Sequence, residues 1–307
     1  MPSPPPLVAL RTYAAIRVSM VAVIVGLGIS VALEIRRVDG CVQRSLSAYY
    51  YTPVRSVFVG ALIALGVAMI ALWGKTPAED AFLNLAGILA TVVAFVPTLD
   101  ANSCGLPAGV KEAALSPDAR KSLDDALIDA NAPAVHNNVA VLVAVIVIAL
   151  ACTAVGAVVR AVRGGAAPSM PVRLGYAATW FGTAAAVLVL LVLYRDADDN
   201  GSFFNHRLHS WSAVVLFGFV ILAVGAAAVK KRIDSGAWTR WELTYWVLAI
   251  AMAGSALVIE LTGRLADPDT WYAGHRTFVM EATLIVLLAA FWVVQTIDRR
   301  LDGAPRY

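Results

Sequence analysis

The chain contains the apolar run NVAVLVAVIVIALACTAVGAVV at residues 138–159, which carries no charged side chain. A helix needs roughly 20 such residues to cross the hydrocarbon core of a bilayer. A helix is also the open segment that satisfies its own backbone hydrogen bonds in lipid. This run therefore predicts a transmembrane helix.

Seven further apolar segments lie on either side of this run. With it they form the set 13–33, 56–73, 81–98, 138–159, 174–194, 212–229, 241–262 and 278–296. Aromatic residues such as Trp73, Tyr194 and Trp271 stand near their edges, as is typical of membrane interfaces. We therefore predict an all-α fold, a polytopic transmembrane bundle of about eight helices.

The composition supports a membrane protein. Of the 307 residues 60% are hydrophobic and 15% are charged, whereas soluble domains have about 25% charged residues. This excludes intrinsic disorder and a soluble enzyme. The net charge of +3 is small, and no nucleic-acid module is visible, so we expect the lipid bilayer and no nucleic acid as partner. Protein partners stay unknown.

The connections suggest one domain and an orientation. We expect a disordered tail over residues 1–12, a single transmembrane domain over 13–297, and a C-terminal tail over 298–307. Residues 99–135 form the one long connection, with a short helix predicted in it at 116–129. From the fourth segment onward Lys and Arg favour the side of both termini, which predicts cytoplasmic termini in the cell membrane.

Three cysteines occur, without a CxxC pair. In this threading Cys41 and Cys104 lie in outer loops, while Cys152 lies within the fourth segment. An oxidising outer compartment permits a disulfide between the first two. The alternative is two free thiols.

All four histidines lie at the predicted outer helix ends. Asp100 and Glu260 are expected near the same level. Imidazole and carboxylate groups are ligands that zinc accepts, and the candidate ligands are His136, His206, His209 and His275. The alternative is ordinary interfacial histidines that hydrogen-bond at helix ends.

Three further residues are candidates for chemistry at this outer side. Glu281 lies near the start of the last segment, where an ionisable group is costly and usually faces the bundle interior. Arg55 follows three tyrosines and can pair with a lipid phosphate or with Asp100. Arg276 is a candidate partner for Glu281, as a structural pair or beside a catalytic acid.

One stretch carries a resemblance to a family. Ser47-Ala48-Tyr49-Tyr50-Tyr51-Thr52 is followed by the six residues 55–60, Arg-Ser-Val-Phe-Val-Gly. This resembles a family of uncharacterised bacterial multi-pass proteins with a Ser-x-Tyr-Tyr-Tyr-Thr-like stretch before Arg-x-x-Phe-Val-Gly. The run 85–98, which ends in Phe-Val-Pro-Thr, is similar to that family's next helix.

More distantly, the layout resembles the membrane hydrolase superfamily of alkaline ceramidases and progestin/adiponectin-type receptors. These proteins hold zinc with three histidines, assisted by a serine and an aspartate. The resemblance implies Ser47, Asp100 and His209 as site residues, with one or two further histidines. The chain departs from the superfamily in the spacing of His206 and His209, in lacking a histidine in the second segment, and in having an eighth segment.

Two functions remain open from the sequence. One is a metal-dependent hydrolase of lipid amides or esters, with zinc on the histidines, Asp100 or Glu260 as the base and Ser47 assisting. The other is a non-enzymatic transporter, sensor or accessory bundle, in which histidines and Glu281 move protons or satisfy interfacial hydrogen bonds.

Overall fold

The computed structural model describes residues 7–96, 98, 104, 116–164 and 167–299 of the 307-residue chain. For residues 193–207 and several positions between 117 and 129 it describes the backbone alone. The described elements are α1 (Leu7–Arg37), the 3-10 helix η1 (Ser47–Tyr51), α2 (Arg55–Ala71), α3 (Pro77–Phe95), α4 (Pro117–Val162), α5 (Met170–Ser235), α6 (Arg240–Leu265) and α7 (Trp271–Asp298). No strand occurs in these residues, which confirms the all-α prediction.

The helices have the length and composition of membrane spans. Within the described residues, seven apolar helical stretches are long enough to cross a bilayer, and two of them belong to α5: Met170–Val192 and Leu208–Ser235. The eighth apolar segment is α2, a shorter helix of 17 residues. The chain is therefore a multi-pass membrane protein, and the predicted apolar segments correspond to these stretches.

Side-chain caps fix where several helices begin. Thr76, Ser116, Thr239 and Thr270 each accept a hydrogen bond from the backbone N–H three residues later. Such an oxygen satisfies one of the N–H groups that lack a partner within the helix. At its other end α5 stops at Gly236, whose φ of 65° is a left-handed conformation that glycine adopts without strain.

Three predicted boundaries are wrong. The helix starts at Leu7, so residues 7–12 belong to α1 rather than to a tail. The short helix predicted at 116–129 is the first part of α4, which continues through Pro133 into the membrane stretch. The connection expected between the fifth and sixth segments is helical backbone within α5.

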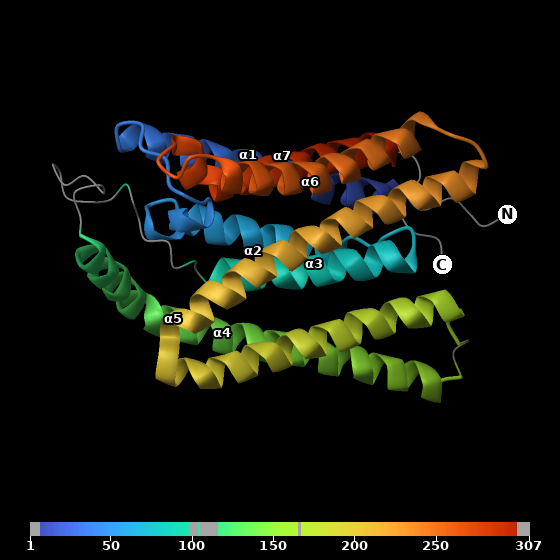
Figure 1. Cartoon of the computed structure of the whole chain (residues 1–307). Helices are drawn as coiled ribbons and strands as arrows, with labels where there is room; N and C mark the ends of the chain where they lie inside the picture. The colour runs from blue at the N-terminus through green and yellow to red at the C-terminus, as the bar shows by residue number, and fades with distance from the viewer. Residues whose placement is uncertain (1–6, 97, 99–103, 105–115, 165–166, 300–307) are drawn as a thin grey trace.

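The helices form three groups. Figure 1 shows α1, α6 and α7 together, α2 and α3 beside them, and α4 with the first stretch of α5 on the far side. Within α5 the ribbon turns back between its two apolar stretches, and the second stretch crosses the bundle to contact both α3 and α6.

Apolar side chains fill the spaces between these groups. The larger buried cluster draws on α1, α2, α3, α6, α7 and the second stretch of α5. A second cluster joins α3 to α4 and α5. The backbones of α2 and α3 approach closely, because a Cβ at Gly66 would lie 2.6 Å from the Gly87 carbonyl oxygen.

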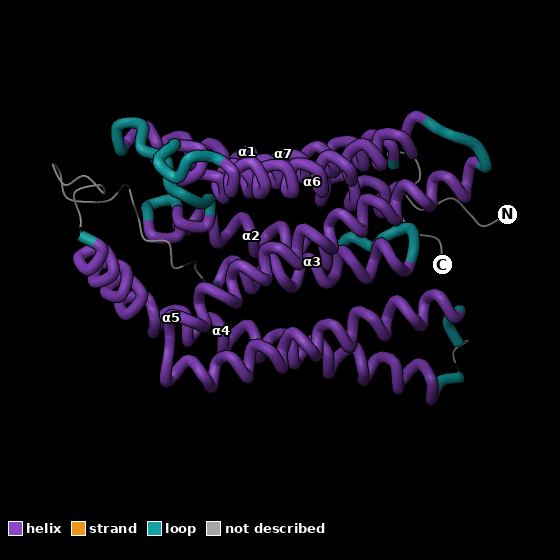
Figure 2. The backbone as a smooth tube through the Cα atoms, in the orientation of Figure 1, coloured by secondary structure: helices purple, strands orange, loops and turns teal. Residues whose placement is uncertain are grey.

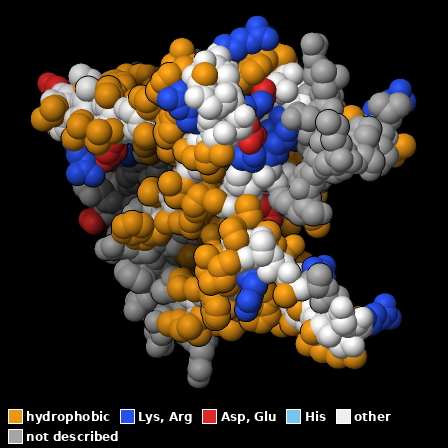
Figure 3. All heavy atoms as spheres, turned by 90° about the vertical axis from the view of Figure 1, so that its right-hand side faces the viewer, with side chains coloured by type: hydrophobic (Ala, Val, Ile, Leu, Met, Phe, Trp, Pro, Cys, Tyr) orange, Lys and Arg blue, Asp and Glu red, His pale blue; other side chains and the backbone are white. Residues whose placement is uncertain are grey.

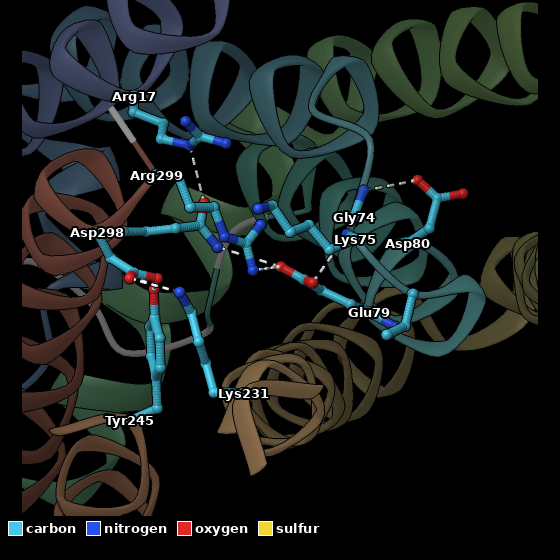
Figure 4. A network of polar contacts seen from close by, with 11 residues as sticks. Arg17, Gly74, Lys75, Glu79, Asp80, Lys231, Tyr245, Asp298 and Arg299 are labelled. Carbon is cyan, nitrogen blue, oxygen red and sulfur yellow. Dashed lines mark hydrogen bonds and ion pairs between the residues drawn. The ribbon is translucent and has the colours of Figure 1, made fainter. Parts of the chain in front are cut away.

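A buried polar network connects five helices at the end of the bundle where α3 begins and α7 ends (Figure 4). Glu79 Oε1 accepts hydrogen bonds from Arg299 at 2.7 Å and from Gln295 at 3.1 Å. Gln295 in turn accepts from Arg17 Nε at 2.9 Å. The side chains of Glu79 and Arg299 are 0% and 3% exposed, so each charge depends on the other for its solvation.

A neighbouring carboxylate extends this network to α5 and α6. Asp298 accepts hydrogen bonds from Lys231 at 2.6 Å and from the Tyr245 hydroxyl at 2.9 Å. Figure 3 looks onto this end of the molecule and shows Lys and Arg side chains gathered among hydrophobic ones. Asp298 therefore ties the end of α7 to α5 and α6.

We expect Glu79→Ala to destabilise the protein strongly. The substitution leaves the Arg299 guanidinium buried without its carboxylate, and breaking a buried pair in this way costs about 3 kcal/mol or more. The midpoint of thermal unfolding in detergent measures the effect. Asp234→Ala, which removes the exposed Lys230–Asp234 pair, is the control and should change the free energy of unfolding by at most about 1 kcal/mol. Equal midpoints for the two variants would contradict the role given to Glu79.

Candidate functional site

The candidate site lies at the opposite end of the bundle from the Glu79 network. Here η1 and the loop before it, drawn in Figure 2 among the connections at that end, contact the start of α7. The end of α3 and the start of the second stretch of α5 complete the surroundings. Residues far apart in the sequence therefore meet at one place.

Ser47 and His209 are in direct contact. The Ser47 hydroxyl oxygen lies 2.8 Å from His209 Nε2. The two residues are 4% and 3% exposed, so the contact is shielded from bulk solvent. A buried serine hydroxyl beside an imidazole nitrogen is the arrangement that activates a hydroxyl as a nucleophile.

The end of α3 orients the His209 ring. His209 Nδ1 lies 2.6 Å from the carbonyl oxygen of Val96, which follows the last residue of α3. A carbonyl only accepts, so Nδ1 carries the proton. The last carbonyl groups of a helix have no partner within it, which leaves that of Val96 free to hold the ring. Nε2 is thereby directed at Ser47.

Glu281 contacts Ser47 from the opposite side. Its Oε1 atom lies 3.0 Å from the Ser47 hydroxyl oxygen. Its Oε2 atom accepts hydrogen bonds from the backbone N–H of Leu46 at 2.7 Å and of Ser47 at 3.4 Å. One carboxyl group therefore fixes the start of η1 and also contacts the hydroxyl that this turn presents.

The side chains of His209, Ser47 and Glu281 form one hydrogen-bonded line. Two hydrogen bonds meet at the Ser47 oxygen, one from the side of His209 and one from the side of Glu281. A serine hydroxyl carries one proton, and both Glu281 Oε1 and His209 Nε2 lie within hydrogen-bond distance of the Ser47 oxygen.

An apolar cavity opens beside Ser47 and Glu281. It has a volume of about 50 Å³ and is lined by Leu46, Ser47, Phe58, Leu62, Leu65, Met69, Ala90, Val93, Ala213, Leu216, Phe217, Glu281, Ile285 and Leu288. The lining side chains come from α2, α3, α5, α7 and the turn around η1. Ser47 and Glu281 are its two polar members, so a group in the cavity meets polar side chains at one place.

Tyrosines hold η1 against its neighbours. Arg55 donates to the Tyr50 hydroxyl at 2.5 Å and to Asn131 of α4 at 2.9 Å. The Tyr51 hydroxyl donates to the Thr98 carbonyl oxygen at 2.7 Å. Tyr49 accepts from the Gln43 N–H, and burial raises the pKa of its hydroxyl, which therefore stays neutral. Arg55 thus contacts Tyr50 and Asn131, while its pairing with a lipid phosphate or with Asp100, which lies outside the described residues, stays a prediction.

A disulfide joins Cys41 and Cys104, with the Cα atoms 5.7 Å apart. Of the two alternatives for these residues, the structure has the bridge. Cys41 precedes the loop that carries Ser47, and Cys104 follows α3, which presents the Val96 carbonyl. The bond therefore links the two segments between which the His209 ring is held.

The other predicted site residues lie outside this contact set or outside the described residues. His275 stacks on Trp271, and its ring nitrogens lie 2.7 Å and 3.1 Å from the carbonyl oxygens of Trp271 and Val42. Glu260 pairs with Arg264 at 2.7 Å and with Arg276 at 3.7 Å, so the expected partner of Glu281 contacts Glu260. His136 is half-buried on α4. Asp100 and the His206 side chain lie outside the described residues.

The metal site expected from the histidines stays a prediction. Among the side chains that the structure describes, no three His, Cys, Asp or Glu residues are grouped so as to hold a metal ion. Both ring nitrogens of His209 are engaged by Val96 and Ser47. The Val96 carbonyl was not expected from the sequence. The available signal was that an apolar segment ends just before Pro97, where a helix leaves carbonyl groups without partners.

We expect Cys104→Ser to lower thermal stability. A disulfide that closes a sequence separation of 63 residues is worth up to about 4 kcal/mol in the loop-closure model. The midpoint of thermal unfolding in detergent should fall for this variant and stay unchanged for Cys152→Ser, which removes an exposed free thiol. A wild-type midpoint that is insensitive to reductant would count against the contribution of the bridge.

No protein-family model, curated protein or solved structure matches this chain. The two resemblances read from the sequence therefore stay predictions. The functional assignment rests on the geometry of Ser47, His209, Glu281 and the adjoining cavity.

Proposed function

We propose that this protein is a membrane-embedded hydrolase of ester or amide bonds in lipids, with Ser47 as the nucleophile and His209 as the general base. The observation that carries the proposal is the 2.8 Å contact between the Ser47 hydroxyl and His209 Nε2, with Nδ1 held by the Val96 carbonyl. A nucleophile, a base and a group that orients the base are the parts that such catalysis requires.

The reaction begins with attack of the Ser47 oxygen on the substrate carbonyl carbon. The hydroxyl proton moves to His209 Nε2, and the resulting imidazolium donates it to the leaving alcohol or amine as the carbon–oxygen or carbon–nitrogen bond breaks. Water then attacks the acyl-serine ester. One proton of that water passes through His209 to the Ser47 oxygen, which releases the acid and restores the enzyme.

The described neighbours support each of these steps. The Val96 carbonyl accepts from Nδ1 in both protonation states of His209, so the ring keeps its orientation through the cycle. Glu281 lies 3.0 Å from the attacking oxygen. Through Oε2 it also accepts hydrogen bonds from the backbone N–H groups of Leu46 and Ser47, which keeps the attacking oxygen in place.

The membrane supplies the class of substrate. Apolar side chains cover the exposed faces of the spans, and the cavity beside Ser47 is apolar, so amphiphilic lipids are the molecules present at high local concentration. We place the protein in the cytoplasmic membrane with both termini inside, which puts Ser47 at the outer side. Lys and Arg residues at the end where α1 begins and α7 ends favour this orientation (Figure 3).

A metal-dependent form of the same hydrolysis draws its support from the sequence. In that form the histidines would hold zinc, which would supply a bound water of lowered pKa, and Ser47 would assist. This alternative names Asp100 as a base and His206 as a ligand. Asp100 and the His206 side chain lie outside the described residues.

We expect a fluorophosphonate probe to label the detergent-purified protein at Ser47. Labelling should be abolished in Ser47→Ala and slowed about 100-fold or more in His209→Gln, because the base is lost. Ser45→Ala is the matched control, since Ser45 is equally buried two residues away and accepts from the Ala48 N–H instead of contacting His209. Mass spectrometry locates the label, and a label that persists in Ser47→Ala would remove the proposed nucleophile.

Chelation separates the two forms of the hydrolase. In the metal-independent form, labelling and ester hydrolysis persist after dialysis against a strong chelator. Near-stoichiometric zinc by elemental analysis that disappears in His209→Ala, together with loss of hydrolysis on chelation, would replace the proposed mechanism by the metal-dependent one.

A further inference from the structure

We infer that the substrate of this site is a lipid resident in the leaflet at the Ser47 end of the bundle, and that it reaches Ser47 sideways from the bilayer, between α5 and α7. The inference rests on the proposed hydrolase function and adds the route by which the substrate arrives. It is carried by the pattern of exposure around the cavity beside Ser47 and by the depth of that cavity in the membrane.

The cavity beside Ser47 is open on the side of α5 and α7. Its lining residues from α2, α3 and the turn around η1 are all buried, and so are Leu216 and Leu288. Among the described residues that line it, those that keep exposed surface are Ala213 and Phe217 on α5 and Glu281 and Ile285 on α7. Because the cavity is not enclosed, its opening lies between these two pairs of side chains.

The course of α5 explains why the opening lies there. The second stretch of α5 packs on α3 and α6 and has little contact with α7. In Figure 1 this stretch lies beside α6 where the two helices are joined, and it diverges from α6 and α7 toward the end that carries η1. The helix α6, which is described over its whole length, contributes no residue to the cavity lining. The divergence therefore leaves this side of the cavity uncovered.

The surface around the opening is apolar. Val214 on α5 is 59% exposed and Val286 on α7 is 64% exposed, and each is the chain neighbour of a residue at the opening. Both belong to stretches that are apolar and long enough to span a membrane. The opening therefore faces hydrocarbon, and a strongly polar molecule would lose its hydrogen bonds with water on this route.

The depth of the site suits the carbonyl group of a lipid. Trp211, two residues after His209 on α5, is 62% exposed. Tryptophan side chains are enriched where headgroups meet hydrocarbon, so His209 and the Ser47 hydroxyl that contacts it lie near that level. The ester and amide bonds of lipids lie at the same boundary, between headgroup and chain. A lipid can therefore bring its carbonyl carbon to Ser47 by lateral movement, without leaving the membrane.

The remainder of the cavity offers a wall for a hydrocarbon chain. On α2 the lining runs from Phe58 through Leu62 and Leu65 to Met69, which at about 1.5 Å per residue is about 16 Å along the helix. Because α2 begins next to η1, this wall leads from the level of Ser47 toward the middle of the bundle. The carbonyl and the chain of one lipid thus meet the polar and the apolar part of the site in the order in which the lipid carries them.

Two covalent probes that differ in where they reside test the route. Diisopropyl fluorophosphate is small and dissolves in water, whereas hexadecyl fluorophosphonate stays in the bilayer, and both react with an activated serine. The rate at which each labels Ser47 is measured by mass spectrometry on the full-length protein in phosphatidylcholine vesicles. We expect the wild type to react with the hexadecyl probe. Absence of that reaction, with labelling by the small probe retained, overturns the inference.

Bulky side chains at the opening should slow the bilayer-resident probe selectively. Ala213→Trp narrows the opening from α5, and Ile285→Trp narrows it from α7. In each variant we expect the ratio of the hexadecyl rate to the small-probe rate to fall about tenfold or more, since one misfitted methylene in a hydrophobic pocket already has an effect of this size. Val214→Trp and Val286→Trp are the matched controls, because these exposed neighbours do not line the cavity. Equal ratios in the opening variants and their controls overturn the inference.

Failure of the inference and failure of the proposed function give different results. If neither probe labels the protein in a way that Ser47→Ala abolishes, the hydrolase and the route fall together. If both probes label Ser47 but the ratio is unchanged at the opening, the hydrolase stands and the lateral route falls. Thermal unfolding midpoints establish that the compared proteins are folded. Where a tryptophan variant does not fold, Ala213→Leu and Ile285→Phe make the same comparison with less added volume.

Discussion

A polar group inside a membrane protein has to find its partner within the chain, because the surrounding lipid offers none. This constraint organises both ends of the bundle. At one end Glu79, Arg299 and Gln295 satisfy one another between helices. At the other, Leu46 and Ser47 direct their backbone N–H groups at Glu281, and the Val96 carbonyl accepts from His209. Between these ends the contacts are almost entirely apolar.

The two polar ends differ in a way that matters for function. The Glu79 network joins oppositely charged groups whose hydrogen bonds hold helices together. At the other end, the Ser47 hydroxyl contacts both His209 Nε2 and Glu281 Oε1 with a single proton of its own. This group of three side chains also borders the apolar cavity. A hydroxyl between a carboxylate and an imidazole nitrogen can pass its proton to either of them, which a fixed pair of opposite charges cannot do. Ser47 holds that position.

Much of the fold follows from local sequence. Apolar runs of sufficient length identify the membrane stretches. His209 and Glu281 stand out in the sequence as ionisable residues near the outer helix ends, whereas Ser47 is named only through the distant family resemblance. Their mutual contacts do not follow, because η1, α5 and α7 are brought together by packing over separations of up to 235 residues. Glu79 was missed since the predicted segment began at residue 81, although Thr76 and Pro77 form a capped helix start. The continuity of α4 through Pro133 was missed because proline usually interrupts a helix interior.

The bond between Glu281 and the Leu46 N–H also bears on how the protein is made. Residues are synthesised from the N-terminus, so η1 emerges long before α7 exists. Until α7 is inserted, the N–H groups of Leu46 and Ser47 lack the carboxyl group that holds them in the finished structure. The arrangement at Ser47 is therefore completed last in biogenesis, and nascent chains still at the translocon do not yet hold the serine in its final geometry.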